Sequence, residues 1–356
     1  MKKVLFLYTE TAPYFMACVE RAVKDHGVEV HIVRWPVNEE APFDLKPVDG
    51  ITVHARDSFN AASLRRFANN LRPDIILASG WVDKTYLQVC RDARKRGTPT
   101  VMCSDTAWRG GLRQWAAVGM GRLWLHRTFS HAWVTGEAQA MYASFLGFPR
   151  RRVKTGFYAA DLDHFAPLAN RFGAAKAARF PHRFLCVARY IPAKGHQYLV
   201  ETFAELCDAG QAGDWELWCI GTGELHPMAH SHPRIKHLGF VQADEVWRYM
   251  EQSGVFILPS LYEPWGVVVH EHAAAGFPLL LSDAVGARHR FLEEGRNGHC
   301  FIAGDKESLR KTFGKVIATP DGELLAMGRR SAELALGWGP GQWAATLMEL
   351  ITSGDE

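Results

Sequence analysis

Short runs of hydrophobic residues alternate with longer stretches of helical periodicity along the whole chain. The runs are apolar on all sides, which is typical of strands in a parallel sheet covered by helices on both faces. We predict strands at residues 4–8, 28–33, 75–79, 100–103 and 132–135, and again at 183–188, 216–220, 255–259 and 279–282. This alternation predicts doubly wound α/β architecture with right-handed crossovers.

A stretch without strand character divides the chain. Proline and glycine interrupt residues 155–182, and a new apolar strand begins at Arg183. A chain of 356 residues is long enough for two α/β domains. We therefore predict a first domain at 1–168, a second at 169–340, and a final helix at 341–356 that could pack back on the first. Both domains are expected to be Rossmann-like and to face each other across a cleft.

Composition narrows the class of protein. Hydrophobic residues make up 47% of the chain and charged residues 22%, which is ordinary for a globular protein. The seven cysteines include no Cys-x-x-Cys pair and several lie in apolar runs, as in the reduced core of a cytosolic protein. The first apolar run is too short for a signal peptide, and no run approaches the roughly 20 residues that span a bilayer. We expect a cytoplasmic protein with no bound metal and no nucleic-acid partner.

Charge is unevenly distributed. The net charge is +3, but residues 91–154 carry twelve Lys and Arg against three acids. Such runs are usually solvated helix faces, although they can also attract an anionic partner such as a membrane surface or a phosphorylated acceptor. Within this stretch, residues 108–127 mix aromatics with arginines. They form either an amphipathic helix with Trp and Leu in the core, or a surface that docks lipid headgroups or a carbohydrate chain. The second alternative would make the protein peripheral to the inner face of the membrane.

Candidate chemistry lies where predicted strands end in the second half. Arg189 and Lys194 lie on a strand-to-helix loop, where two cations and free backbone amides can bind phosphate. Gly221 and Gly223 follow the next strand. They lack the third glycine of the dinucleotide fingerprint, which disfavours a nicotinamide enzyme.

A third strand end carries two carboxylates. Glu263 precedes a predicted helix that Pro264 helps to start, and Glu271 lies inside that helix. The backbone amides of Gly266 and Val267 would point out of the helix start, toward an anion. Cations and amides suit the phosphates of a nucleotide diphosphate, and carboxylates suit sugar hydroxyls. The sequence therefore predicts a nucleotide-sugar site at this edge of the sheet.

Residues 183–305 resemble the retaining glycosyltransferases of family 4, which have the two-Rossmann GT-B fold. The resemblance rests on Arg189 with Lys194-Gly195, Gly221-x-Gly223, Pro259-Ser260, Glu263-x₇-Glu271, Pro264-Trp265-Gly266 and Ala274-Ala275-Gly276-x-Pro278. It implies that Arg189 and Lys194 bind the donor diphosphate and that Glu271 binds ribose hydroxyls. It also implies that Glu263 holds the transferred sugar together with the Gly266 and Val267 amides, with Gly221 and Gly223 in the donor site.

The resemblance implies no bound metal and no cofactor other than the nucleotide-diphosphate sugar as co-substrate. Asp161-Leu162-Asp163 looks like the metal-binding Asp-x-Asp of other glycosyltransferases, but it matches the domain-linking turn of this family. The first half departs from the family, because the loop after the first strand has no glycine. Asp105 takes the place of a usual histidine near residue 103. Asp105 and Arg109 are therefore our acceptor-side candidates.

These features predict a hexosyltransferase that moves a sugar, with retention, to a hydroxyl of a glycan, a lipid or a small molecule. Two alternatives use the same donor site. A GT-B nucleotide-sugar 2-epimerase would need no acceptor, and a catalytically inert nucleotide-sugar binding protein would turn over nothing. The spacing of the two glutamates relative to Arg189 and Lys194 favours the transferase.

Overall fold

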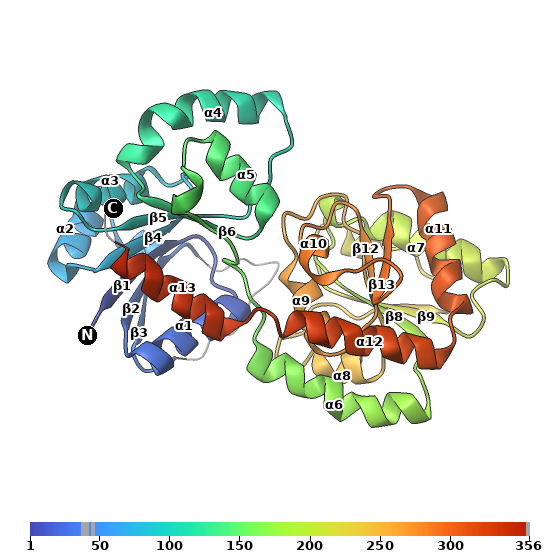
Figure 1. Cartoon of the computed structure of the whole chain (residues 1–356). Helices are drawn as coiled ribbons and strands as arrows, with labels where there is room; N and C mark the ends of the chain where they lie inside the picture. Colours follow the sequence, from blue (N-terminus) through green and yellow to red (C-terminus); the bar gives the residue numbers. More distant parts are fainter. Residues whose placement is uncertain (37–42, 44–46, 354–356) are drawn as a thin grey trace. The chain divides into compact units, whose positions relative to one another are not determined.

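The computed structural model describes residues 1–36, 43 and 47–353, which fold into two α/β units (Figure 1). Of the described residues, unit 1 is built from 1–36, 47–159 and 338–353, and unit 2 from 43 and 160–337. Each unit contains one parallel sheet with helices on both faces. The predicted fold class, α/β with two Rossmann-like domains, is confirmed.

The described part of unit 1 contains a seven-stranded parallel sheet in the order β3-β2-β1-β4-β5-β6-β7. Its strands are β1 (Lys3–Tyr8), β2 (Glu29–Arg34), β3 (Ile51–Ala55), β4 (Ile75–Ser79), β5 (Thr100–Ser104), β6 (His131–Val134) and β7 (Val153–Lys154). Its helices are α1 (Pro13–His26), α2 (Ala61–Leu71), α3 (Lys84–Lys95), α4 (Leu112–Trp124), α5 (Glu137–Phe145) and α13 (Pro340–Thr352). The strand order reverses beside β1, which makes the sheet doubly wound.

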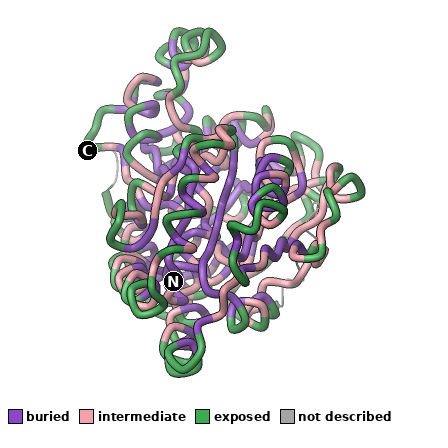
Figure 2. The backbone as a smooth tube through the Cα atoms, turned by 90° about the vertical axis from the view of Figure 1, so that its right-hand side faces the viewer, coloured by how far each residue is buried: buried purple, intermediate pink, exposed green. Residues whose placement is uncertain are grey.

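Alternation of side chains along β1 explains why both faces of this sheet are covered. Leu5 and Leu7 belong to one buried cluster, and Val4 and Phe6 belong to another on the opposite face. The central residues of the strands are buried, while buried and exposed residues alternate along the helices (Figure 2). Continuous apolar runs such as β1 are therefore buried on two sides.

The C-terminal helix α13 lies in unit 1, where it packs against α1. Trp343 is fully buried, and its ring lies 4.8 Å from that of Trp133 and 6.2 Å from that of Phe6. Its indole N–H donates to the Phe157 carbonyl over 2.7 Å. Residues at opposite ends of the chain therefore share one core.

The described part of unit 2 contains a six-stranded parallel sheet in the order β10-β9-β8-β11-β12-β13. Its strands are β8 (Arg183–Val187), β9 (Glu216–Ile220), β10 (Ile235–His237), β11 (Val255–Leu258), β12 (Leu279–Ser282) and β13 (Gly298–Phe301). Its helices are α6 (Leu162–Ala178), α7 (His196–Asp208), α8 (Trp247–Glu251), α9 (Val267–Ala274), α10 (Arg288–Phe291), α11 (Lys306–Ala318) and α12 (Asp321–Ala335). The order reverses beside β8.

The division between the units lies between Ala159 and Ala160, earlier than the 168/169 boundary expected from the sequence. Residue 168 lies inside α6, which begins after Asp161 and runs through Pro167. The Asp161 carboxylate caps this helix by accepting the His164 amide at 3.2 Å. Buried side chains such as Phe172 pack α6 onto the rest of unit 2, so tertiary packing maintains the helix through Pro167, although the sequence pattern alone indicates an interruption there.

Candidate active site

The four predicted strand ends of unit 2 lie together at one edge of its sheet. The loops that follow β8, β9, β11 and β12 all leave the carboxyl ends of neighbouring parallel strands. This edge is where open α/β sheets bind ligands. The structure therefore brings the predicted donor residues onto one scaffold.

Two glycines in the loop after β9 allow it to lie close against the loop after β8. The Tyr190 amide donates to the Thr222 carbonyl at 2.8 Å. Gly221 has φ +136°, and a Cβ there would lie 2.0 Å from the Ala188 carbonyl oxygen. A Cβ on Gly223 would lie 2.7 Å from the Tyr190 carbonyl oxygen. Only glycine allows the two loops to approach this closely, so these residues shape the backbone whatever else they bind.

The loop after β11 is tied to both of its neighbours. The Ala193 carbonyl accepts the amides of Leu261 and Tyr262 at 2.8 and 3.0 Å. The Gly286 amide, in the loop after β12, donates to the Glu263 carbonyl at 3.0 Å. These bonds fix the backbone of Glu263 relative to the loop that carries Lys194.

Lys194 and Glu263 form an ion pair. The lysine Nζ lies 2.5 Å from the glutamate Oε2, and the two side chains are 15% and 11% exposed. Residues that are 69 positions apart in sequence therefore meet at the sheet edge. Each holds the other in place, and the pair presents both a cation and a carboxylate to a ligand.

The start of α9 lies beside this pair. Gly266 precedes the helix with φ +92°, and a Cβ there would lie 3.1 Å from the Cγ of Glu263. Val267 is the first helical residue. Amides in the first turn of an α-helix have no partner within the helix and carry its positive dipole end. This helix start is suited to hold an anionic or hydroxyl-rich group next to Glu263.

Glu271 lies one turn further along α9 and is partly buried. Burial raises the pKa of its carboxyl group from 4.5 to about 7, and the negative charge of Asp161 acts in the same direction. Asp161 is the residue that caps α6. Glu271 therefore changes its protonation state near neutral pH, which the sequence did not suggest.

Arg189 lies between two residues whose backbones are fixed. The Ala188 amide donates to the Ile220 carbonyl at 3.0 Å, and Tyr190 is bonded to Thr222. Arg189 itself is partly buried at this edge. The structure thus places Arg189 on the same loop as Lys194.

An aromatic and histidine cluster beneath this loop was not anticipated. Tyr190 is 1% exposed, its ring stacks on that of His196 at 3.9 Å, and its hydroxyl lies 2.7 Å from the Nδ1 of His237. His226 meets the same ring edge-on at 4.9 Å. Burial lowers the pKa of His196 to about 3, so its ring stays neutral. Tyr190 beside Arg189 was the only signal in the sequence, because the three histidines come from separate segments.

No cluster of His, Cys, Asp or Glu arranged to hold a metal ion is found within the described ranges. The same part of the chain contains no helix long and apolar enough to cross a bilayer.

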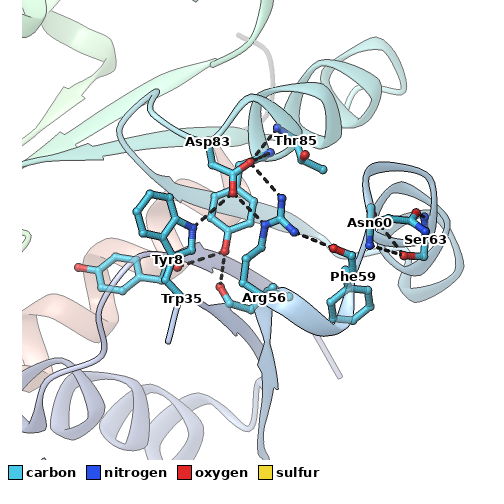
Figure 3. A network of polar contacts seen from close by, with 10 residues as sticks. Tyr8, Trp35, Arg56, Phe59, Asn60, Ser63, Asp83 and Thr85 are labelled. Atoms are coloured by element: carbon cyan, nitrogen blue, oxygen red, sulfur yellow. Dashed lines mark hydrogen bonds and ion pairs between the residues drawn. The ribbon is translucent and has the colours of Figure 1, made fainter. Parts of the chain in front are cut away.

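The carboxyl edge of the unit 1 sheet is occupied by a polar network (Figure 3). Asp83 accepts from the Nε of Arg56 at 2.8 Å and from the indole N–H of Trp35 at 3.3 Å. The hydroxyl of Tyr86 donates to the carbonyl of Tyr8, the last residue of β1, at 3.2 Å. The side chain of Tyr86 therefore holds the end of β1, and the loop that follows this strand contains no glycine.

The acceptor-side candidates lie in different settings within unit 1. Burial raises the pKa values of Tyr8 and Tyr158 well above the usual range, and the negative charge of Asp105 contributes to both. Asp105 therefore lies near both phenols. Arg109 is exposed in the turn before α4, where its amide donates to the Gln114 Oε1 at 2.7 Å.

Two family models match this chain, one in each unit. Residues 11–155 match the glycosyl transferase 4-like domain, and residues 181–319 match the glycosyl transferases group 1 domain. The chain has the two domains of a GT4-type glycosyltransferase. The family assignment agrees with the resemblance seen in the sequence, and it extends to the first half.

Curated relatives of the family are distant. A putative glycosyltransferase, EpsF of Bacillus subtilis, is 28% identical over 54% of this chain and 53% of its own length. The chain thus spans about half of that relative. A GDP-mannose-dependent alpha-(1-6)-phosphatidylinositol monomannoside mannosyltransferase of Mycolicibacterium smegmatis is 25% identical over 73% of this chain and 72% of its own length.

Solved structures support the fold. The Anabaena HepE protein, crystallised in complex with UDP and glucose, is similar with a TM-score of 0.72 and 16% sequence identity. The match covers 99% of this chain and 100% of that chain. At this identity the likeness demonstrates the GT-B fold.

Proposed function

We propose that this protein is a glycosyltransferase that transfers a hexosyl group from a nucleotide-diphosphate sugar to an acceptor hydroxyl, with retention of configuration. The observation that carries the proposal is the junction of Lys194, Glu263 and the start of α9 at one sheet edge. Arg189 belongs to the same loop as Lys194. A diphosphate needs cations and amides, and a sugar needs carboxylates, and this edge offers both.

Arg189 and Lys194 bind the diphosphate in this proposal. Guanidinium and ammonium groups form charge-assisted hydrogen bonds with phosphate oxygens. These bonds are roughly twice as strong as hydrogen bonds between neutral groups. As the glycosidic bond breaks, negative charge accumulates on the departing diphosphate. The two cations stabilise that charge, and no bound metal or further cofactor is required.

Glu263 and the amides of Gly266 and Val267 hold the transferred sugar, while Glu271 accepts hydrogen bonds from ribose hydroxyls. The ionised form of Glu271 is the stronger acceptor. Because its pKa lies near 7 in the free protein, we expect donor affinity to increase as pH rises through that value. Because Gly221 and Gly223 have no side chains, their loop lies close against the loop after β8 and leaves room for the nucleotide to approach.

Relatives leave the nucleotide base open. The HepE structure contains UDP, whereas the mycobacterial relative is named for GDP-mannose. The acceptor belongs to unit 1 in this proposal, with Asp105 and Arg109 as candidate contacts. A glycan, a lipid-linked sugar or a small molecule would each supply the hydroxyl.

Thermal-shift measurements with uridine and guanosine diphosphates and their sugars, with and without EDTA, test the donor site. A ligand at 100 times its dissociation constant should stabilise the folded protein by about 2.7 kcal/mol. We expect a shift that EDTA does not change and that Arg189→Ala removes. Arg179→Ala, an exposed change in the same unit, is the matched control. A shift that survives in Arg189→Ala would contradict the assignment.

Product analysis with the stabilising donor then tests the reaction. Transfer should release the nucleotide diphosphate only when an acceptor is present, and Arg189→Ala should slow it by roughly 10²–10³-fold. Conversion of the donor into an epimeric nucleotide sugar without any acceptor would indicate an epimerase. Binding without turnover across an acceptor panel would indicate an inert binding protein.

A further inference from the structure

Helix α4 of unit 1 is hydrophobic on two opposite sides. Its inner side is packed, because Val118 and Gly121 are buried and a Cβ on Gly121 would lie 3.0 Å from the Leu146 side chain. Its outer side is exposed and apolar. The exposed fractions there are 89% for Leu112, 58% for Trp115, 60% for Met120 and 71% for Leu123. A solvated helix would carry polar residues at these positions.

The exposed residues form one stripe. Leu112, Trp115, Met120 and Leu123 follow helical spacing, and the exposed small residues Ala116 and Gly119 lie between them. We call this stripe the outer face of α4. Figure 1 shows α4 on the outside of unit 1, beyond α5. Of the two alternatives for this segment, the one that places its Trp and Leu residues in the core is therefore wrong for Leu112, Trp115 and Leu123.

Arginines border the outer face on both sides. At about 100° per residue, Arg113 and Arg122 lie roughly 90° to either side of the stripe. Arg122 donates from its Nε to the Phe145 carbonyl at 3.0 Å, which anchors that border to α5. Arg127 is exposed just after the helix. The arrangement is an apolar centre between two cationic margins.

No acid compensates this charge within the segment. Residues 106–136 contain no Asp or Glu. The next acid along the chain, Glu137, is paired with Arg150 at 3.1 Å. The segment that carries the outer face therefore has a net positive charge, which complements an anionic surface.

We propose that the outer face of α4 docks on an anionic lipid bilayer. Leu112, Met120 and Leu123 enter the boundary between headgroups and acyl chains, and the bordering arginines contact lipid phosphates. Interfacial helices combine an apolar stripe, Trp and flanking bases in this way. Trp115 is held for this role by an edge-on contact with Trp108 at 5.1 Å.

A lipid surface fits these features better than a protein partner. The face is a single convex helix, and its border carries cations, whereas the rim of a protein interface mixes donors and acceptors. The proposal stands apart from the donor site, since all of its residues lie in unit 1 and vesicle binding needs no nucleotide sugar. Failure of either proposal would therefore be recognised without the other.

Sedimentation of the full chain with extruded vesicles tests the proposal. One set contains phosphatidylcholine alone, and the other adds phosphatidylglycerol as the anionic lipid. We expect binding to the anionic vesicles that weakens as salt increases. Each arginine near an anionic surface contributes about fivefold to binding at low salt. The variant Arg113→Gln/Arg127→Gln should therefore bind roughly 20- to 30-fold more weakly.

A second pair of variants separates insertion from charge. Leu112→Gln/Leu123→Gln retains every charge and should also lose vesicle binding, with Met120→Gln as a milder variant in the same direction. Matched controls in unit 2 are Arg179→Gln/Lys311→Gln for charge and Met228→Gln/Leu336→Gln for exposed apolar groups. Circular dichroism confirms that each variant is folded.

Three outcomes would overturn the proposal. The first is an absence of salt-sensitive binding to anionic vesicles. The second is equal loss of binding in the unit 2 controls, which would indicate nonspecific adsorption. The third is a dimer, seen by light scattering without lipid, that Leu112→Gln/Leu123→Gln dissociates, because the outer face of α4 would then be a contact between copies of the chain.

Discussion

The chemistry of individual side chains in unit 2 is set by neighbours that lie far along the chain. Glu271 on α9 is affected by Asp161 at the start of α6, and Lys194 after β8 is paired with Glu263 after β11. Each pair becomes apparent only when the sheet is assembled. Both lead to measurable consequences.

Replacing Glu271 with Gln should change how stability depends on pH. The carboxyl pKa is raised in the folded state, so the folded protein binds the proton more tightly than the unfolded chain. The stabilisation that this proton gives to the folded state is fully present below pH 4.5 and is lost as pH rises through about 7. We expect Glu271→Gln to be more stable than wild type at pH 8 by about 1–3 kcal/mol, with the difference vanishing at low pH. Urea unfolding at several pH values measures it, and Glu323→Gln on α12 is the control. An unchanged pH profile would contradict the raised pKa.

The Lys194–Glu263 pair predicts a non-additive result. Lys194→Met leaves a largely buried carboxylate without its cation and should destabilise the protein by about 2–4 kcal/mol. The double variant Lys194→Met/Glu263→Gln removes both charges and should regain much of that loss while remaining inactive in sugar transfer. Chemical denaturation and donor turnover are the two measurements. Additive losses of stability would show that the pair does not interact.

Among the helices, α9 is joined to two other segments by the side chain of His270. The Nδ1 of His270 accepts the Ala160 amide at 3.0 Å, and its Nε2 donates to the Ala335 carbonyl at 3.0 Å. These two bonds join α9 to the beginning of unit 2 and to the end of α12. His270 therefore satisfies two backbone groups that would otherwise be buried without partners.

We expect His270→Leu to destabilise the protein by roughly 2–4 kcal/mol, since each unpaired buried group costs about 1–3 kcal/mol. His272→Leu is the matched control on the same helix. His272 bonds to the Val268 carbonyl of its own helix at 2.8 Å, so its loss should cost less. Thermal denaturation compares the two variants. A larger loss in His272→Leu would contradict the bridging role of His270.

Edge strands account for what the hydrophobic pattern missed. The predicted strands correspond to β1, β2, β4, β5, β6, β8, β9, β11 and β12, whereas β3, β7, β10 and β13 were not predicted. All four lie at the edges of their sheets. An edge strand is short or covered on fewer sides, so its sequence need not be a continuous apolar run. β3, with exposed residues along Ile51–Ala55, is an example.

In the molecule as a whole, the chain returns to unit 1 at its end. Trp343 of α13 fills the core of a sheet whose first strand is β1. Trp343→Ala should destabilise unit 1 by about 3–5 kcal/mol. Calorimetry should then show an earlier transition for unit 1, while the transition of unit 2 stays responsive to a nucleotide donor.

A substitution in the core of unit 2 tests the opposite case, in which only unit 2 is destabilised. Trp215 is 2% exposed and stacks on Phe184 at 4.4 Å. Trp215→Ala should lower the transition of unit 2 and leave that of unit 1 in place. A single cooperative loss in both variants would show that the two units do not unfold separately.

Local pattern was enough to identify the architecture and the candidate donor residues. Hydrophobic period, glycines after strands and the Glu263-x₇-Glu271 spacing are properties of neighbours along the chain, and parallel strands necessarily bring their carboxyl ends to one edge. Only the folded chain revealed the partners of Lys194 and Glu271, the histidines around Tyr190 and the division after Ala159. It alone showed which side of α4 faces solvent. These features depend on packing between distant segments, and burial and charge act through space, so no local pattern encodes them.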